Sequence, residues 1–470
     1  MNPASPLPFY TRAQRALGDD HLQQALDIAT GRMMVARRQA IGMIADGEAV
    51  RDHARAIRAH TIANLGTYLD RFVASATAAG VQVHFAADAG AATRLVVDLA
   101  RRYDVRRIVK GKSMVSEEIE LNHALEAAGM RVVETDLGEY VIQLDKDVPS
   151  HIIAPIIHKT KAQVAETFRR ELHASDEDVA GIPEMTAFAR RMLRTEFLSA
   201  DMGISGVNFA VADSGSLCLV ENEGNGRLST TVPRVHVALM GIERIVPTAA
   251  DLAVVLRVLA RSGTGQPLTV YTNVVTGPRR ADDPDGPSDL HVVIVDNGRS
   301  RMLRTELEEI LYCIRCGACL NACPVYQEIG GHAYGSVYPG PVGAVYTPGA
   351  FGLEPWADLP QASSLCGACK EACPVRIDIP RMLLALRAQT AEAGLTPRWV
   401  GAGLRVFRLA STRPRLFRLA SSLARRVSRW LGPNGFDRLP GPLQGWTRHR
   451  HFPPMAAQTF TERVRARRRS

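Results

Sequence analysis

Residues 313–324 read Cys-Ile-Arg-Cys-Gly-Ala-Cys-Leu-Asn-Ala-Cys-Pro, and residues 366–374 read Cys-Gly-Ala-Cys-Lys-Glu-Ala-Cys-Pro. Both runs end in a Cys-Pro pair, and together they hold seven of the eight cysteines in a chain of 470 residues. Disulfide frameworks belong to small secreted domains that are dense in cysteine. Thiols gathered in one short part of a long chain instead indicate a metal site.

The first run has the C-x2-C-x2-C-x3-C-P spacing of bacterial ferredoxins, in which the fourth cysteine ligates the other of two iron–sulfur clusters. Three thiolates at intervals of three residues can surround one face of a cluster, and the proline after the fourth prevents the helix from continuing. The second run contains the end of the same pattern, so the spacing predicts two [4Fe-4S] clusters with crossed ligands. The ligands predicted for cluster 1 are Cys313, Cys316, Cys319 and Cys373, and those predicted for cluster 2 are Cys323, Cys366 and Cys369.

Cluster 2 has no fourth cysteine. The position three residues before Cys366 is Ser363. Cluster 2 therefore has a non-cysteine fourth ligand or one open iron, or it is a [3Fe-4S] cluster. The Ser363 hydroxyl is one candidate ligand, although serine is also an ordinary loop residue. Zinc is the weaker interpretation, because zinc sites often use two separated C-x2-C pairs, whereas three evenly spaced cysteines before a Cys-Pro fit cubane clusters better.

The overall composition is ordinary for a soluble globular protein, with 46% hydrophobic and 22% charged residues. No apolar run is long enough to span a bilayer. The first six residues, Met-Asn-Pro-Ala-Ser-Pro, lack the basic and apolar regions of a signal peptide. Reduced cysteines and the missing export signal predict a cytoplasmic protein.

The positive net charge of +9 belongs to the C-terminal tail. Residues 391–470 contain 17 arginines, no lysine and three acidic residues, and the rest of the chain is slightly acidic. Residues 405–411 and 415–421 form a near-repeat, Arg-Val-Phe-Arg-Leu-Ala-Ser and Arg-Leu-Phe-Arg-Leu-Ala-Ser. Basic amphipathic helices of this kind suit an anionic membrane surface, here the inner face of the membrane, or an acidic partner. The alternative is a solvated helix whose apolar face packs on the body.

Periodicity divides the chain into four expected parts. Residues 1–80 show apolar positions at helical spacing, and residues 81–298 alternate short apolar strands with helices, which predicts an α/β domain with a mostly parallel sheet. Within these patterns, residues 140–144 are predicted as a strand and residues 299–312 as a helix. The expected domains are 1–80 (helical segment), 81–298 (α/β), 299–390 (α-helical, ferredoxin-like, two clusters) and 391–470 (basic helical tail).

Two stretches of the α/β region are candidate anion sites. Residues 110–113, Lys-Gly-Lys-Ser, lie between a strand and a helix whose first turn holds Glu117 and Glu118. Free amides at a helix start favour an anion, but the two glutamates already offset the dipole. Residues 221–227, Glu-Asn-Glu-Gly-Asn-Gly-Arg, either approach a ligand through their glycines or form a plain turn. Neither stretch matches a P-loop or a dinucleotide fingerprint. The eighth cysteine, Cys218, lies outside both cysteine runs and is expected to be a small buried residue.

The segment between the two cysteine runs is rich in glycine, proline and aromatic residues. Residues 330–335 read Gly-Gly-His-Ala-Tyr-Gly, and residues 338–343 read Tyr-Pro-Gly-Pro-Val-Gly. A long irregular segment inside a compact domain is usually functional. We expect this segment to cover the clusters. His332 and Tyr334 either contact a partner or the cluster sulfurs, or they have packing roles.

These motifs together resemble the lactate-utilisation protein B family of iron–sulfur proteins. The resemblance rests on residues 110–118, 313–326, 330–343 and 363–375 and extends over about residues 15–390, whereas the tail matches loosely. It implies a sugar-isomerase/CoA-transferase-like fold for the α/β part. It also implies that the seven cysteines hold the clusters and that the missing eighth is a family feature.

The resemblance implies a function in the oxidation of L-lactate to pyruvate together with two partner proteins. The chain has no recognisable flavin or nicotinamide motif, so we expect it to be the electron-transfer subunit, with substrate chemistry in a partner. A competing hypothesis makes the α/β domain a CoA- or acyl-transfer enzyme with Glu221 or Glu223 as the nucleophile and the clusters in a structural or regulatory role. A nucleic-acid-binding role is not expected, because the tail lacks a stacking platform or a known fold motif.

Overall fold

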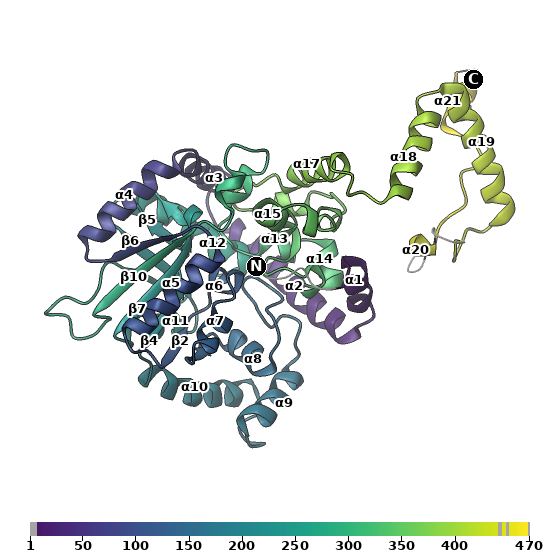
Figure 1. Cartoon of the computed structure of the whole chain (residues 1–470). Coiled ribbons are helices and arrows are strands. Elements are labelled where there is room, and N and C mark those ends of the chain that lie inside the picture. Colours follow the sequence, from purple (N-terminus) through teal and green to yellow (C-terminus); the bar gives the residue numbers. More distant parts are fainter. Residues whose placement is uncertain (1–6, 440–443, 448–450, 469–470) are drawn as a thin grey trace. The chain divides into compact units, whose positions relative to one another are not determined.

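The computed structural model describes residues 7–439, 444–447 and 451–468 (Figure 1). The chain divides into two compact units, Met1–Glu392 and Ala393–Ser470. The first unit contains both the α/β region and all eight cysteines. The two units are treated separately below.

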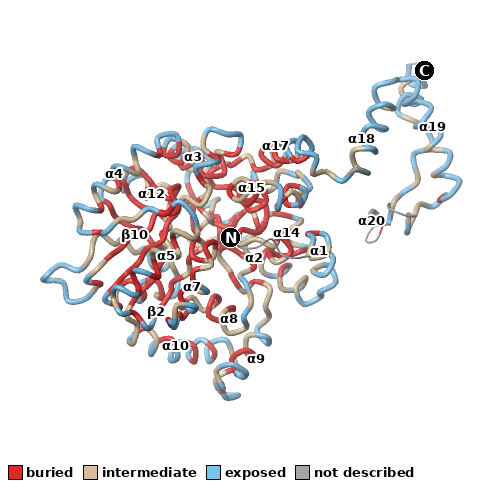
Figure 2. The backbone as a smooth tube through the Cα atoms, in the orientation of Figure 1, coloured by how far each residue is buried: buried red, intermediate tan, exposed pale blue. Residues whose placement is uncertain are grey.

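A six-stranded sheet forms the centre of the first unit. Its strand order is β1-β10-β7-β4-β2-β3, and all neighbouring pairs are parallel. The strands are β1 (Gln82–Ala86), β2 (Arg107–Lys110), β3 (Arg131–Glu134), β4 (Met202–Gly206), β7 (Val235–Gly241) and β10 (Asp289–Val295). Every residue of β7 is buried, as expected for a parallel strand that is covered on both faces (Figure 2). The α/β class with a parallel sheet is therefore confirmed.

Eight helices of the α/β region connect these strands. They are α5 (Ala89–Arg102), α6 (Met114–Glu118), α7 (Leu121–Ala127), α8 (Leu137–Asp145), α9 (Lys161–Leu172), α10 (Ile182–Leu198), α11 (Asn225–Thr231) and α12 (Ala249–Gly263). Side-chain caps define several of their starts, because a hydroxyl or carboxylate accepts from an otherwise unpaired amide. Ser113 caps α6 in this way, and Asp136 caps α8.

A second sheet of four strands, which the sequence did not separate from the first, has the order β8-β5-β6-β9. Its members are β5 (Phe209–Val211), β6 (Ser216–Glu221), β8 (Ile245–Val246) and β9 (Tyr271–Val275). β6 pairs antiparallel with both β5 and β9, whereas β5 and β8 are parallel. Cys218 lies in β6 and is completely buried, as expected.

Two local predictions were wrong. Residues 140–144 belong to helix α8 rather than a strand, because the Asp136 cap starts a helix that carries through this apolar run. Residues 299–312 do not form one helix but two short 3-10 turns, Ser300–Met302 and Glu308–Tyr312. Arg299 is fully buried in an ionic network before the first turn, so tertiary contacts override helical propensity here.

The N-terminal helices pack into the body instead of forming a free arm. They are α1 (Phe9–Leu17), α2 (Asp20–Gly42), α3 (Gly47–Ala63) and α4 (Leu65–Ala78). Helix α2 contacts α12 of the α/β region as well as α13 and α14 of the cysteine region. On α3, the fully buried Arg58 donates to the carbonyls of Ile245 and Leu311, at 2.5 and 3.1 Å. These helices therefore join the sheet to the cysteine region.

The cysteine region is built from short helices. They are α13 (Ala318–Asn321), α14 (Pro324–Ile329), α15 (Gly340–Phe351), α16 (Ala368–Ala372) and α17 (Ile379–Glu392), with 3-10 turns at His332–Tyr334, Glu354–Trp356 and Leu359–Gln361. One continuous hydrophobic core runs from sheet residues such as Phe209 and Met240 to Tyr326 and Leu383 of this region. The α/β and cysteine regions thus share a core and belong to one compact unit.

The second unit carries the basic tail. Its helices are α18 (Arg398–Ser411), α19 (Pro414–Leu431), α20 (Gln444–Thr447) and α21 (Phe460–Arg467). Pro414 starts α19, so the near-repeat forms two helices rather than one. Large apolar side chains on them are exposed, including Phe407 and Phe417. Among the described residues, no helix combines the length and apolar character needed to cross a bilayer.

Candidate iron–sulfur centre and the adjoining cavity

The two cysteine runs adopt the same local turn. In the first, Gly317 has a φ of 76° and precedes α13, and in the second, Gly367 has a φ of 87° and precedes α16. Glycine adopts a left-handed φ without the steric cost that a side chain adds, so the turn favours the glycine of the Cys-Gly-Ala-Cys sequence in each run. Helices α13 and α16 contact each other, which brings the two runs together.

Four cysteines from both runs line one small cavity. They are Cys313, Cys316, Cys319 and Cys373, with Ile152 and Val342 among the apolar residues around them. Burial raises the pKa of the Cys316 thiol, and the neighbouring Cys373 and Cys313 add to the rise. The four cysteines predicted for cluster 1 therefore lie together, although one of them comes from the second run.

The remaining three cysteines form a second group. Burial raises the pKa of the Cys369 thiol to about 12, and the nearby Cys323 and Cys366 add to the rise. Cys366 is exposed, whereas Cys323 and Cys369 are buried. Ser363 has an ordinary loop partner, because its hydroxyl accepts from the Leu365 amide at 3.1 Å. Cys323 of the first run therefore lies near Cys366 and Cys369 of the second run, as the predicted crossed ligation requires.

The spacing of the sulfurs tests whether these residues fit an iron–sulfur cluster. Tetrahedral zinc with Zn–S bonds of about 2.3 Å needs sulfurs that are roughly 4 Å apart. Among the described residues, groups of three or more ligating atoms within 4.8 Å of one another occur at Asp147, His158 and His332 and at Glu117, Glu134 and Glu139, and neither contains a cysteine. Among these residues no three cysteine sulfurs lie within 4.8 Å of one another, and such wider spacing around a cavity fits a larger, multi-iron group.

The segment between the runs covers the first group of cysteines, as predicted. Helix α15 is buried along most of its length, and Val342 reaches the cysteine cavity. Tyr334 is buried beside Cys323. Burial is the main cause that raises the pKa of the Tyr334 phenol, and the nearby Cys323 adds to the rise. His332 is placed elsewhere, since its Nε2 lies 2.7 Å from the carbonyl oxygen of Val148.

A fully buried ionic network fastens this cover to the sheet. Arg299 donates to both carboxylate oxygens of Glu118, at 2.8 and 2.7 Å, and lies 2.8 Å from Glu243. The Tyr338 hydroxyl donates to the same Glu118 carboxylate at 2.6 Å. All three charges are paired, and the Glu118 carboxylate is also hydrogen-bonded to Arg299 and Tyr338, which is the condition for tolerating charge in a protein interior.

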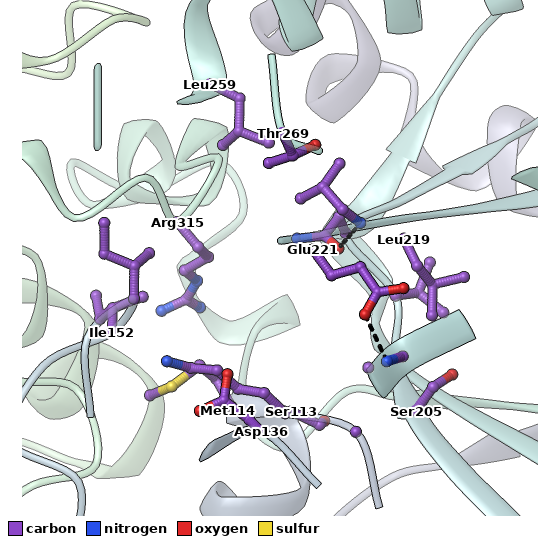
Figure 3. Close-up of a pocket in the computed structure, with 18 of the residues that line it drawn as sticks. Ser113, Met114, Asp136, Ile152, Ser205, Leu219, Glu221, Leu259, Thr269 and Arg315 are labelled. Carbon is purple, nitrogen blue, oxygen red and sulfur yellow. Dashed lines mark hydrogen bonds between the residues drawn. The ribbon is translucent and has the colours of Figure 1, made fainter. Parts of the chain in front are cut away.

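The two stretches predicted as anion sites lie around one cavity of about 280 Å³, shown in Figure 3. Lys112 and Ser113 line it from the first stretch, and Glu221 and Glu223 line it from the second. Lys110 does not line it, because its ammonium group is buried between Glu117 and Glu134 at 2.8 and 2.7 Å. The tertiary fold therefore makes one site from what the sequence presented as two.

The two glutamates of the cavity are in different states. Glu221 accepts from the amides of Gly226 and Arg227 at 2.6 and 2.7 Å and from Asn273 at 2.9 Å, so it serves to hold the turn into α11. Glu223 accepts from the Leu137 amide at 3.1 Å. Burial raises the pKa of Glu223 to about 7, and Asp136 adds to the rise.

The same cavity reaches the cysteine region at its other end. Arg315 and Cys316 both line it, and in Figure 3 Arg315 lies across the open space from Glu221. Arg315 has a left-handed φ of 60°, unusual for a residue with a side chain, and its guanidinium stacks on Tyr338 at 4.1 Å. The sequence analysis missed this residue. The sequence feature that could have identified Arg315 is its position as a charged residue between two cysteines of the predicted metal-binding motif.

Comparisons with known families agree with this division of the chain. A family model described as "LUD domain" matches residues 69–295, one described as "4Fe-4S dicluster domain" matches residues 309–377, and one described as "Lactate utilisation protein B, C-terminal" matches residues 394–469. The fold and the site therefore define a LUD-domain protein with a dicluster iron–sulfur domain. The expectation that the tail matches only loosely was wrong, because it has a family model of its own.

Full-length relatives identify the family. "Lactate utilization protein B" of Shouchella clausii is 44% identical over 98% of both chains, and that of Geobacillus kaustophilus is 43% identical over 97% of this chain and 96% of the relative. "Uncharacterized electron transport protein YkgF" of Escherichia coli K12 is 43% identical over 96% of this chain and 95% of the relative. The chain belongs to the lactate utilisation protein B family. A solved structure of a DUF162 family protein from Deinococcus radiodurans is 14% identical and has a TM-score of 0.28. The match covers 49% of this chain and 98% of that chain, and it is too distant to support an argument.

Proposed function

We propose that this chain is the iron–sulfur electron-transfer subunit of a complex that oxidises L-lactate to pyruvate. The observation that carries the proposal is the cavity lined by Cys313, Cys316, Cys319 and Cys373, which draws ligands from both runs as two-cluster ferredoxins do. The names of the relatives support it, since they describe lactate utilisation in one case and electron transport in another. Two partner proteins complete the proposed complex.

In this proposal the seven cysteines hold two clusters. Cys313, Cys316, Cys319 and Cys373 would hold a [4Fe-4S] cluster 1. Cys323, Cys366 and Cys369 would hold cluster 2, either as [4Fe-4S] with a fourth ligand such as Ser363 or an open iron, or as [3Fe-4S]. Bound clusters of this kind accept and release single electrons. Two clusters can therefore hold, one each, the two electrons that the oxidation of one lactate releases.

The chain's own residues position the second run and keep water away. Arg51 donates to the carbonyl of Cys373 at 2.8 Å, and Arg37 donates to the carbonyl of Ala372 at 2.7 Å. Both guanidinium groups also place positive charge beside thiolates, which favours the deprotonated sulfurs that ligate metal. Ile152 and Val342 line the cavity with apolar surface. A dry, rigid surrounding of this kind suits electron transfer, because little has to move when the charge changes.

Two finer parts of the proposal concern the α/β region and the tail. The α/β region is proposed to have the sugar-isomerase/CoA-transferase-like fold, supported by its parallel sheet and surrounding helices. The tail is proposed to touch an anionic membrane surface, supported by the arginines and exposed apolar residues of α18 and α19.

The test uses anaerobically prepared protein. We expect about eight irons per chain, or about seven with a three-iron cluster 2, and no lactate oxidation by the chain alone. Adding the two proposed partner proteins should give lactate-dependent bleaching of the cluster absorbance. One zinc per chain without iron would contradict the site, and lactate oxidation by the isolated chain would contradict the role as a subunit.

An acyl-transfer enzyme is the second candidate. The observation that favours it is that Glu221 and Glu223 both line the cavity. Three hydrogen bonds occupy Glu221, so Glu223 would have to be the nucleophile. Incubation with acyl-coenzyme A and trapping with hydroxylamine distinguish the two functions, because only the acyl-transfer enzyme forms a covalent adduct at Glu223.

A further inference from the structure

Three arginines lie beside the cysteines that are proposed to hold cluster 1. Arg37 of α2 and Arg51 of α3 are buried, and Arg315, whose side chain is 9% exposed, lines the cysteine cavity itself. Arg37 and Arg51 also hold the second run in place by donating to the carbonyls of Ala372 and Cys373. The fold therefore brings three cations from separate parts of the chain to one group of thiols.

Each of these guanidinium groups contains a donor without a partner. Nε of Arg37, Nε of Arg51, and both Nε and Nη1 of Arg315 are buried and make no hydrogen bond within the part of the chain that the structure describes. Buried polar groups in native proteins are nearly always paired, and an unpaired donor on a charged group is especially costly. The unpaired donors therefore indicate an anionic acceptor beside these cysteines.

Arg37 shows most clearly which anion this is. It interacts electrostatically with Cys316 and Cys373, and neither interaction is weaker than its interaction with the carboxylate of Glu371. Arg37 and Arg51 also repel each other. Two buried cations that repel each other need a nearby anion to be held together, and metal-bound thiolates supply that negative charge.

Carboxylates offset the other two charges in part. Arg51 pairs with Glu48 at 2.7 Å, but Glu48 is 64% exposed, so water screens this pair. Arg315 lies 3.6 Å from Glu243, and Glu243 also pairs with a second buried arginine at 2.8 Å. Arg37 therefore carries the least compensated of the three charges.

We propose that Arg37, together with Arg51 and Arg315, stabilises the reduced state of cluster 1 and thereby raises its reduction potential. Reduction adds one electron, which a reductant such as dithionite supplies, and no bond forms or breaks. The fixed guanidinium groups attract the added negative charge, and charge and hydrogen bonding around a cluster set its potential. The arginines thus make cluster 1 a better electron acceptor. This inference deepens the proposed function: it rests on the proposed ligands of cluster 1 but not on lactate as the substrate.

A redox titration of the anaerobic full-length chain with dithionite tests the proposal, with electron paramagnetic resonance following each cluster. The signal of cluster 1 is the one that Cys373→Ser removes or alters. Arg37→Met should lower the potential of this cluster by about 59 mV or more, which corresponds to a tenfold change in the equilibrium constant of a one-electron reduction. The potential of cluster 2 should change less, so it supplies an internal reference.

Matched variants separate charge from structure. Arg38 follows Arg37 on α2 but is exposed, so Arg38→Met should leave the potential unchanged. Arg37→Lys keeps the positive charge and should retain most of the parent potential. Arg315→Gly removes a charge while glycine readily keeps the left-handed φ of 60°, and it should also lower the potential. Iron content and visible absorbance show whether each variant is loaded, and Arg315→Gly supplies the measurement where Arg37→Met loses iron.

Several results would overturn the proposal. They are an unchanged potential of cluster 1 in both Arg37→Met and Arg315→Gly, an equal fall in Arg38→Met, and a fall of the same size in both clusters. Loss of iron from these two variants and from Arg37→Lys would also overturn it, because the arginines would then have a structural role alone. Absence of lactate-dependent bleaching leaves the titration intact, so the two proposals fail separately.

Discussion

Cys373 is the residue at which the crossed arrangement can be tested most directly. It belongs to the second run, yet it lines the cavity formed by Cys313, Cys316 and Cys319. Cys373→Ser should therefore remove or distort the cluster held by the first run, and Cys323→Ser should affect the cluster held by Cys366 and Cys369. Electron paramagnetic resonance with iron analysis separates the two signals. Damage confined to the cluster of the substituted run would disprove the crossing.

His236 on β7 makes folding stability depend on pH. Burial lowers the pKa of its imidazole to about 3, with His291 adding to the effect, and it pairs with Ser205 at 2.7 Å. An unfolded histidine titrates near 6.5, so below that pH the unfolded state binds a proton that the folded state does not, and stability falls as the pH falls. The free energy of unfolding should drop by about 1.4 kcal/mol between pH 7.5 and 5.5 from this residue alone.

Denaturant unfolding at both pH values measures this effect. His236→Gln keeps a polar group of similar size and removes the titration, so its stability should fall less over the same interval. His21, an exposed histidine on α2, supplies the matched control, and His21→Gln should retain the full pH dependence. Identical pH profiles for the parent and His236→Gln would mean that this histidine does not contribute.

At the scale of an element, helix α15 depends on a very close backbone approach. A Cβ on Gly343 would lie 1.5 Å from the Tyr338 carbonyl oxygen, closer than any real contact. Gly343→Ala should therefore displace the cover over the first group of cysteines, lower stability by about 1–3 kcal/mol as overpacking does, and speed the loss of cluster absorbance in air. The absorbance decay at fixed oxygen concentration measures the effect.

Gly66 on α4 is the control for that substitution. Nothing lies within 4 Å of the Cβ that alanine would add there, and alanine is the better helix former. Gly66→Ala should leave the rate of cluster loss unchanged and stabilise the chain by up to about 1 kcal/mol. Equal decay rates for the two alanine variants would show that α15 does not protect the site.

At the scale of the whole molecule, the tail is proposed to act at a surface. Each arginine near an anionic bilayer contributes roughly 1 kcal/mol, and α19 carries arginines together with exposed Phe417 and Trp430. The intact chain should sediment with anionic vesicles and not with neutral ones, more weakly at high salt. A chain truncated after Glu392, the end of the first unit, should lose this binding. Binding that ignores lipid charge or survives truncation would point to a protein partner instead.

Local patterns in the sequence were sufficient for several features. The positions of the seven cysteines and two Cys-Pro pairs predicted an iron–sulfur site, and the matching dicluster family model agrees. Strands alternating with helices predicted a parallel α/β sheet, and Pro414 marks the break between α18 and α19. These signals succeed because ligand spacing, strand burial and proline geometry each act within a few residues of the chain.

Tertiary structure alone decided which distant residues meet. Lys112, Glu223 and Arg315 come from separate parts of the chain, and only the parallel sheet and its packing against the cysteine region bring them to one cavity. Local patterns likewise did not predict that residues 140–144 are helical or that Arg299 pairs with Glu118 in the interior. The physical reason is that burial and electrostatic pairing depend on which surfaces pack together, whereas periodicity and propensity describe only a segment by itself.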